Sequence, residues 1–108
     1  MRIKIWQIDT RVSGAVSAMF ENYEHTCKYL GGVKRELYKC EFNGDTTAKT
    51  LDEVYEVFNR YRPIGFDGRS LSVSDVIEVT EGEKKGAYFV DSVGFVELMP
   101  CQWEAGTC

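Results

Sequence analysis

Residues that carry out chemistry are scarce in this chain. It has a single histidine, His25, and its four cysteines include no pair at the C-x-x-C spacing of structural zinc sites. The phosphate-binding spacing G-x-x-x-x-G-K-[ST] is also missing. A serine nucleophile needs a base within hydrogen-bond reach, and one histidine on the expected outer face of a helix does not provide it. We therefore expect no metal, no cofactor and no catalytic residues.

Long apolar runs are absent as well. No stretch approaches the roughly 20 apolar residues that cross a bilayer. Residues 1–6 read as a strand and lack the apolar region of a cleavable signal. These features predict a cytoplasmic protein that does not bind membranes. The net charge of −4 argues against general DNA binding, because a protein that binds the phosphate backbone needs a basic surface.

Apolar residues make up 44% of the chain, and their spacing predicts two helices and five strands. Apolar positions three and four residues apart predict helices over residues 16–30 and 51–61. A Thr50–Glu53 capping box begins the second helix and Pro63 ends it. This helix is expected to face the core with Leu51, Val54, Tyr55, Phe58 and Tyr61. The strands are expected at residues 2–8, 36–42, 76–80, 87–91 and 95–98.

This order, strand–helix–strand–helix–strand–strand–strand, predicts an α+β fold with two helices packed on one mixed sheet of about five strands. The first strand carries apolar residues on both faces, so we expect it near the centre of the sheet. Residues 1–99 are expected to form one domain and residues 100–108 a C-terminal tail, from which Trp103 docks back on the body.

Several local features are also predicted. Ser13 is expected to cap the first helix, and Gly31 to end it with a left-handed residue. Residues 43–45 are expected to turn the chain away from the second strand. Cys27 and Cys40 fall at positions that should face the core, where a thiol behaves as a small apolar group.

The stretch from Arg62 to Ile77 is the most informative part of the chain. It contains one proline, two glycines, two arginines, three serines and two aspartates between two patterned elements. We expect Gly65 and Gly68 to take positive φ, and the serines and Asp75 to bond nearby backbone amides, which would shape a rigid corner between helix and strand.

The arginines have no such structural role, and beside amides and hydroxyls they suit an anion. The candidate ligand- or partner-binding residues are therefore Arg60, Arg62, Arg69, Ser70, Ser72 and Ser74.

Three segments resemble a known family. LDEVYEVFN at 51–59, FDGRSLSVSDV at 66–76 and YFVDSVGF at 88–95 are similar to the YodL-like domain, and the resemblance covers about residues 1–98. It implies a setting in Gram-positive bacteria, phages and conjugative elements, and it carries no established catalytic residues. Arg69 stands where histidine is common in these domains, which weakens any histidine-based catalytic hypothesis for this chain.

These observations lead to competing functional hypotheses. The first is a small non-enzymatic binding module of a phage or mobile element, which engages a host or mobile-element protein; the implied genetic setting favours counter-defence against a bacterial immune component. The alternative is a sponge that binds a small nucleotide or another phosphate ligand at the arginine-rich corner. A hydrolase is a third and weaker hypothesis. The exposed edge of the last strand offers a further contact surface, either for strand addition by a partner or for a homodimer.

Overall fold

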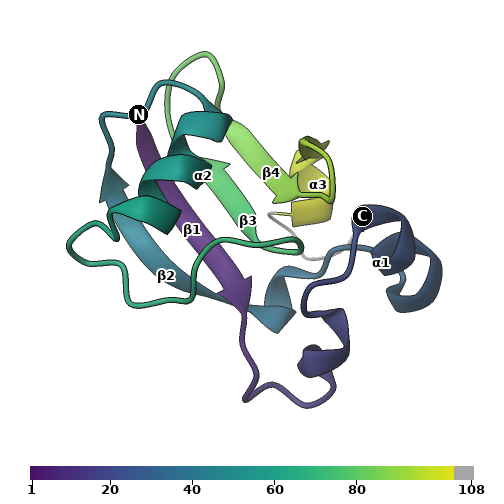
Figure 1. Cartoon of the computed structure of the whole chain (residues 1–108). Coiled ribbons are helices and arrows are strands. Elements are labelled where there is room, and N and C mark those ends of the chain that lie inside the picture. Colours follow the sequence, from purple (N-terminus) through teal and green to yellow (C-terminus); the bar gives the residue numbers. More distant parts are fainter. Residues whose placement is uncertain (104–108) are drawn as a thin grey trace.

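The protein forms a five-stranded sheet with short helices on both of its faces (Figure 1). The structure, a computed structural model, describes residues 1–103. In spatial order the strands are β2 (Tyr38–Asp45), β1 (Arg2–Ile8), β3 (Val76–Val79), β4 (Gly86–Val90) and β5 (Phe95–Leu98). The helices are η1 (Ala15–Ala18), α1 (Tyr23–Leu30), η2 (Arg35–Leu37), α2 (Leu51–Arg60) and α3 (Pro100–Trp103).

The predicted α+β class is confirmed, but two details of the prediction are wrong. Every neighbouring pair of strands is antiparallel, so the sheet is not mixed. The described residues form three α-helices rather than two, because the C-terminal segment contributes α3. The central place of β1 is confirmed, since it pairs with β2 on one side and β3 on the other.

Two apolar clusters cover the two faces of the sheet. Ile3 and Ile5 of β1 face α2, which crosses the front of the sheet in Figure 1. Trp6 and Ile8 face the opposite cluster, which includes Trp103 of α3. The alternation along β1 therefore buries the strand on both faces, as its sequence predicts. Gln7 falls on the same side as Ile3 and Ile5, and its exposed fraction is only 1%.

A bulge in β2 explains why its predicted pattern fails. Ile5 pairs with Phe42 while Trp6 pairs with Cys40, so Glu41 has no residue opposite it. The extra residue places Tyr38 and Phe42 in opposite clusters and leaves Cys40 exposed, contrary to expectation. The strand also continues through residues 43–45, where Gly44 pairs with Ile3, so the predicted turn is wrong.

The expected helix over residues 16–30 is divided. The 3₁₀ turn η1 ends at Ala18, Phe20 takes a φ of 67°, and α1 starts only at Tyr23. Asn22, rather than Ser13, caps α1 by accepting a hydrogen bond from the His25 amide at 2.7 Å. Gly31 ends α1 with a φ of 78°, as predicted. Cys27 is exposed, so its expected core position is also wrong.

The start of α2 confirms most of the predicted capping. The Thr50 hydroxyl accepts a hydrogen bond from the Glu53 amide at 3.1 Å. The Glu53 carboxylate accepts one from the Lys49 amide at 2.9 Å, one residue before the expected partner. Val54 and Phe58 are buried as predicted.

Two tyrosines and the tail depart from expectation. Tyr55 and Tyr61 are exposed, contrary to the inward positions that helical spacing predicts. The C-terminal segment forms α3 rather than a simple tail, and it buries Trp103, whose ring packs edge-on against Trp6 and Tyr38 at centroid distances of 5.5 and 5.4 Å. Docking of Trp103 is thus confirmed, and residues 104–108 of the expected tail lie outside the described residues.

Candidate functional site

The stretch 62–75 forms a corner between α2 and β3, and core contacts anchor it at both ends. The Phe66 ring packs edge-on against Phe58 of α2 at 5.2 Å, and Leu71 is 2% exposed. The Asn59 side chain accepts a hydrogen bond from the Leu71 amide and donates one to the Leu71 carbonyl at 3.1 Å. This pair of bonds ties the last turn of α2 to the corner, as a neighbouring strand would.

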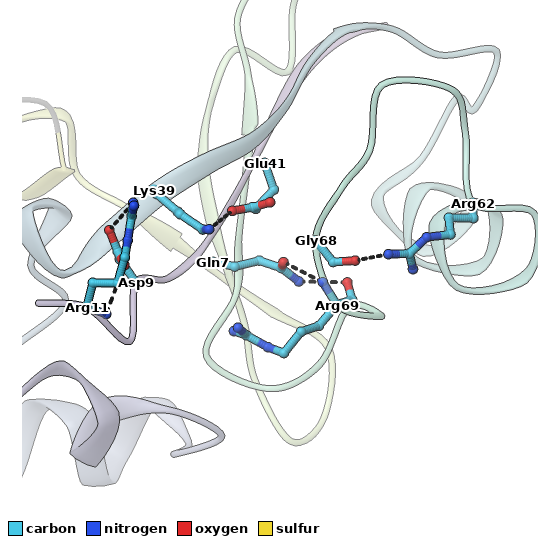
Figure 2. Close-up of polar contacts among 8 residues, drawn as sticks. All are labelled: Gln7, Asp9, Arg11, Lys39, Glu41, Arg62, Gly68 and Arg69. Carbon is cyan, nitrogen blue, oxygen red and sulfur yellow. Dashed lines mark hydrogen bonds and ion pairs between the residues drawn. The ribbon is translucent and has the colours of Figure 1, made fainter.

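A buried amide holds the middle of the corner (Figure 2). Gln7 Nε2 donates to the Arg69 carbonyl at 2.9 Å, and Gln7 Oε1 accepts from the Arg69 amide at 3.0 Å. A Cβ on Gly68 would lie 2.0 Å from Gln7 Oε1, so only glycine fits there. Gly68 does not have the positive φ that we predicted, whereas Gly65, at 90°, does.

Asp75 is the buried carboxylate of the corner, with an exposed fraction of 1%. Its Oδ2 accepts hydrogen bonds from Gln7 Nε2 and from the Ser72 amide, each at 3.0 Å. Burial raises the pKa of Asp75 to about 6, and it outweighs these two bonds and the charge of Arg69, which all lower it. The predicted bond from Asp75 to a nearby amide is confirmed; the link to Gln7, 68 positions away, was missed.

The three candidate arginines do not converge on one point. Arg60 lies on the exposed face of α2, 3.4 Å from Glu56. Arg62 Nη2 donates to the Gly68 carbonyl, and the guanidinium lies over the Phe66 ring at 5.4 Å. Figure 2 shows the guanidinium groups of Arg62 and Arg69 on opposite sides of the corner. The structure therefore does not gather Arg62 and Arg69 into one basic cluster.

The candidate serines also differ from one another. Ser70 is exposed, and the buried Ser72 hydroxyl has no hydrogen-bond partner within residues 1–103. Ser74 has a φ of 86°, and its hydroxyl accepts a hydrogen bond from the Phe20 amide at 2.9 Å. The serines therefore do not share the predicted role of bonding nearby amides, because the Ser74 hydroxyl instead joins segments 54 positions apart.

Backbone strain collects around this corner. Outside glycine, positive φ is found at Phe20, Arg62 and Ser74 among the described residues. Such conformations cost about 1–3 kcal/mol each and persist only where the surrounding structure imposes them. Two of the three, Phe20 and Ser74, are joined directly by the Ser74 hydroxyl.

The described residues offer no catalytic arrangement around the corner serines. His25, on α1, instead lies 3.6 Å from Glu21, and its ring centre is 4.7 Å from that of Tyr29 with the two rings tilted by 44°. Within residues 1–103 there is no group of three or more side chains suited to holding a metal ion. In the same range, every helix is too short or too polar to cross a membrane.

The tip of the corner is apolar and exposed. Ile64 is fully exposed, and Tyr61 is 70% exposed. Pro63 and Phe66 close a turn through a 3.1 Å backbone hydrogen bond, with Gly65 at its third position, where a type II turn requires positive φ. Sequence reasoning placed the arginines at this corner but missed Ile64, because an apolar residue between helix and strand usually belongs to the core.

Comparison with known proteins agrees with the sequence resemblance. The family model of the YodL-like domain matches residues 2–100. The protein YodL of Bacillus subtilis (strain 168) is 30% identical over 71 residues, which cover 64% of this chain and 62% of that protein. The chain thus aligns with less than two thirds of that relative's length. No solved structure matches. This chain belongs to the YodL-like domain family.

Proposed function

We propose that this chain is a small, non-enzymatic protein-binding module whose contact surface is the tip loop, residues 61–65. The observation that carries the proposal is Ile64, a fully exposed isoleucine beside the exposed Tyr61. Single exposed apolar residues are common on protein surfaces. What distinguishes this one is a backbone held in place on both sides.

The anchoring of the tip supports the proposal. Arg62 takes a φ of 46°, donates to the Gly68 carbonyl and covers the Phe66 ring. Phe66 is 3% exposed and fixes the far side of the turn in the core. A preorganised loop loses little conformational entropy on binding, so the apolar surface of Ile64 and Tyr61 contributes more of its burial energy to affinity. Aromatic and aliphatic anchors of this kind dominate many interfaces.

The partner is proposed from the family setting and the tip chemistry. We propose a host or mobile-element protein with an apolar pocket for Ile64, and counter-defence remains the specific form of this hypothesis. Arg60 and Arg62, on either side of Tyr61, favour an acidic rim around such a pocket. Inhibition of a bacterial immune component would then be a consequence of binding and would need no catalytic residue.

Ile64→Ser is the variant that tests the proposal. The tagged protein is used to capture partners from a bacterial lysate, and the captured proteins are identified by mass spectrometry. Loss of a specific partner is expected for Ile64→Ser with an unchanged melting temperature, because the side chain makes no core contact. Val93→Ser is the matched control, since Val93 is 91% exposed in the turn between β4 and β5. Identical captures by wild type and Ile64→Ser would contradict the proposal.

The nucleotide alternative has lost much of its geometric support. It required several arginines to converge, whereas Arg60 pairs with Glu56 and Arg62 with the Gly68 carbonyl. Arg69 alone does not select a nucleotide. A thermal shift against a panel of cyclic and linear nucleotides separates the two hypotheses, because a ligand that binds the folded state raises the melting temperature.

A further inference from the structure

Four buried polar atoms of the corner have no hydrogen-bond partner within residues 1–103. They are Nε and Nη2 of Arg69, the Ser72 hydroxyl oxygen and Oδ1 of Asp75. Buried polar groups in native proteins are nearly always paired, so an unpaired set in one place calls for a physical cause. Unpaired donors on a buried guanidinium edge are costly, because the group is charged.

The three side chains belong to one site. The Ser72 amide donates to Asp75 Oδ2, and Gln7 Nε2 bonds both Asp75 Oδ2 and the Arg69 carbonyl. Arg69 and Asp75 also interact electrostatically. Nε and Nη2 form one edge of the guanidinium, the edge that binds two oxygens of a single carboxylate or phosphate side by side.

Phe20 covers this site. The Arg69 guanidinium lies under the Phe20 ring, 6.0 Å from its centre, and the ring is on the surface with 56% of the residue exposed. Phe20 has a φ of 67°, and its amide is held by the strained Ser74. Strained residues of this kind cluster where a segment moves during binding.

We propose that Arg69, Ser72 and Asp75 form a binding site for a hydrogen-phosphate group, and that Phe20 is its lid. The unpaired edge of Arg69 supplies two donors, while Asp75 Oδ1 supplies an acceptor. A ligand that pairs with the two Arg69 donors and with the Asp75 acceptor must present two acceptor oxygens and one hydroxyl. Inorganic phosphate retains a proton at neutral pH and meets this demand. Sulfate has the same shape but no proton, and it would place an oxygen against the carboxylate.

The site is independent of the proposed protein-binding surface. Figure 2 shows Arg69 on the side of the corner away from Arg62, which stabilises the tip loop. Ile64→Ser is therefore expected to leave phosphate binding unchanged. Failure of one proposal would thus not imply failure of the other.

A titration of the wild-type chain with inorganic phosphate, followed by amide chemical shifts, tests the proposal without any variant. At a pH of about 7.5, above the pKa of Asp75, the amides of Phe20, Arg69 and Ser72 are expected to shift saturably. Sulfate is then expected to bind about tenfold more weakly, because it leaves the ionised Asp75 unsatisfied. A parallel titration with methyl phosphate distinguishes free phosphate from an ester-linked group. Absence of a saturable shift at millimolar phosphate, or equal binding of sulfate, would overturn the proposal.

Arg69→Lys keeps the positive charge but removes the paired donors, so it is expected to weaken phosphate binding at least about tenfold. Arg2→Lys is the matched control, because Arg2 pairs with Asp45 at the start of β1, and it is expected to bind phosphate as the wild type does. Phe20→Ala is expected to speed exchange of the bound phosphate, because it removes the lid. If Arg69→Lys binds phosphate with the affinity of the wild type, the chemical-shift changes come from another site and the proposal is wrong.

Discussion

Gln7 of β1 binds Arg69 through both of its backbone groups, at 2.9 Å to the carbonyl and 3.0 Å to the amide, although 62 positions separate the two residues. The side-chain amide thus binds the backbone of the corner as a neighbouring strand would. It also positions Asp75 through a third hydrogen bond. The stretch 68–75 is therefore held by one buried side chain of β1, in addition to the bonds that Asn59 makes to Leu71.

The first prediction concerns the close approach of Gly68 to Gln7. Gly68→Ala is expected to lower the free energy of unfolding by about 1–3 kcal/mol, because the added methyl group meets Gln7 Oε1 and Glu41. Gln7→Ala is expected to cost roughly 3 kcal/mol, since it leaves buried groups unpaired. The double variant should cost less than the sum by about 1 kcal/mol, because the shortened side chain makes room for the methyl group. Urea unfolding measures all three.

Gly82→Ala provides the control for this cycle. A methyl group added at Gly82 would have no atom within 4 Å, so the cost of this substitution is limited to the strain of a φ of +94°. When Gly82→Ala is combined with Gln7→Ala, the two losses of unfolding free energy are expected to add. Strict additivity of Gly68→Ala with Gln7→Ala would show that the contact between these residues does not determine the corner.

The second prediction follows from the raised pKa of Asp75. Its folded pKa of about 6 lies above the ordinary value of 3.8, so ionisation of Asp75 opposes folding. The Asp75 contribution to stability is therefore full below the ordinary pKa and is lost as pH rises from about 4 to about 6. Asp75→Asn removes this dependence. The stability of wild type relative to Asp75→Asn is expected to fall, on the order of 2–3 kcal/mol, across this window.

The groups facing Asp75 set the size of this effect. Arg69 favours the charged carboxylate, and an arginine keeps its charge throughout this pH window. The buried Tyr38 donates its hydroxyl to the Ser74 carbonyl at 2.6 Å, and burial raises the pKa of this tyrosine still further above the window. Urea unfolding at several pH values measures the difference, and a constant gap between wild type and Asp75→Asn would contradict a buried, destabilised carboxylate.

The third prediction concerns the link between α2 and the corner. Asn59→Ala removes both bonds to Leu71 and is expected to lower the free energy of unfolding by about 1–3 kcal/mol. Asn59→Asp can still accept from the Leu71 amide but cannot donate to its carbonyl, so an intermediate loss is expected. If the two variants are equally stable, the paired bonds are not what holds the corner.

Local signals in the sequence determined much of the fold. Apolar spacing and turn residues predicted five strands, although the bounds of β2 differ, and the Thr50–Glu53 pair marked the start of α2. Gly31 and Gly65 were recognised because a left-handed residue after a helix or within a turn is a local requirement. These features depend on neighbours a few positions apart, which a single sequence displays directly.

The errors arose where distant residues decide the structure. The Phe20 conformation that divides the first predicted helix accompanies a bond to Ser74, far along the chain. The bulge at Glu41 depends on pairing with β1. Arg62 resembled a free ligand-binding group because nothing in its neighbourhood reveals that it folds back on the Gly68 carbonyl. Gln7 had one signal: a polar residue on the side of β1 that carries Ile3 and Ile5.

The central claim is that the chain binds a protein partner through its tip loop, and site-specific photo-crosslinking tests it most directly. A photoreactive amino acid is placed at position 64 or, as a control, at position 93, and both proteins are irradiated in bacterial lysate. A discrete crosslinked partner is expected from position 64 and none of that mass from position 93. No specific product from position 64, or the same product from both positions, would contradict the account.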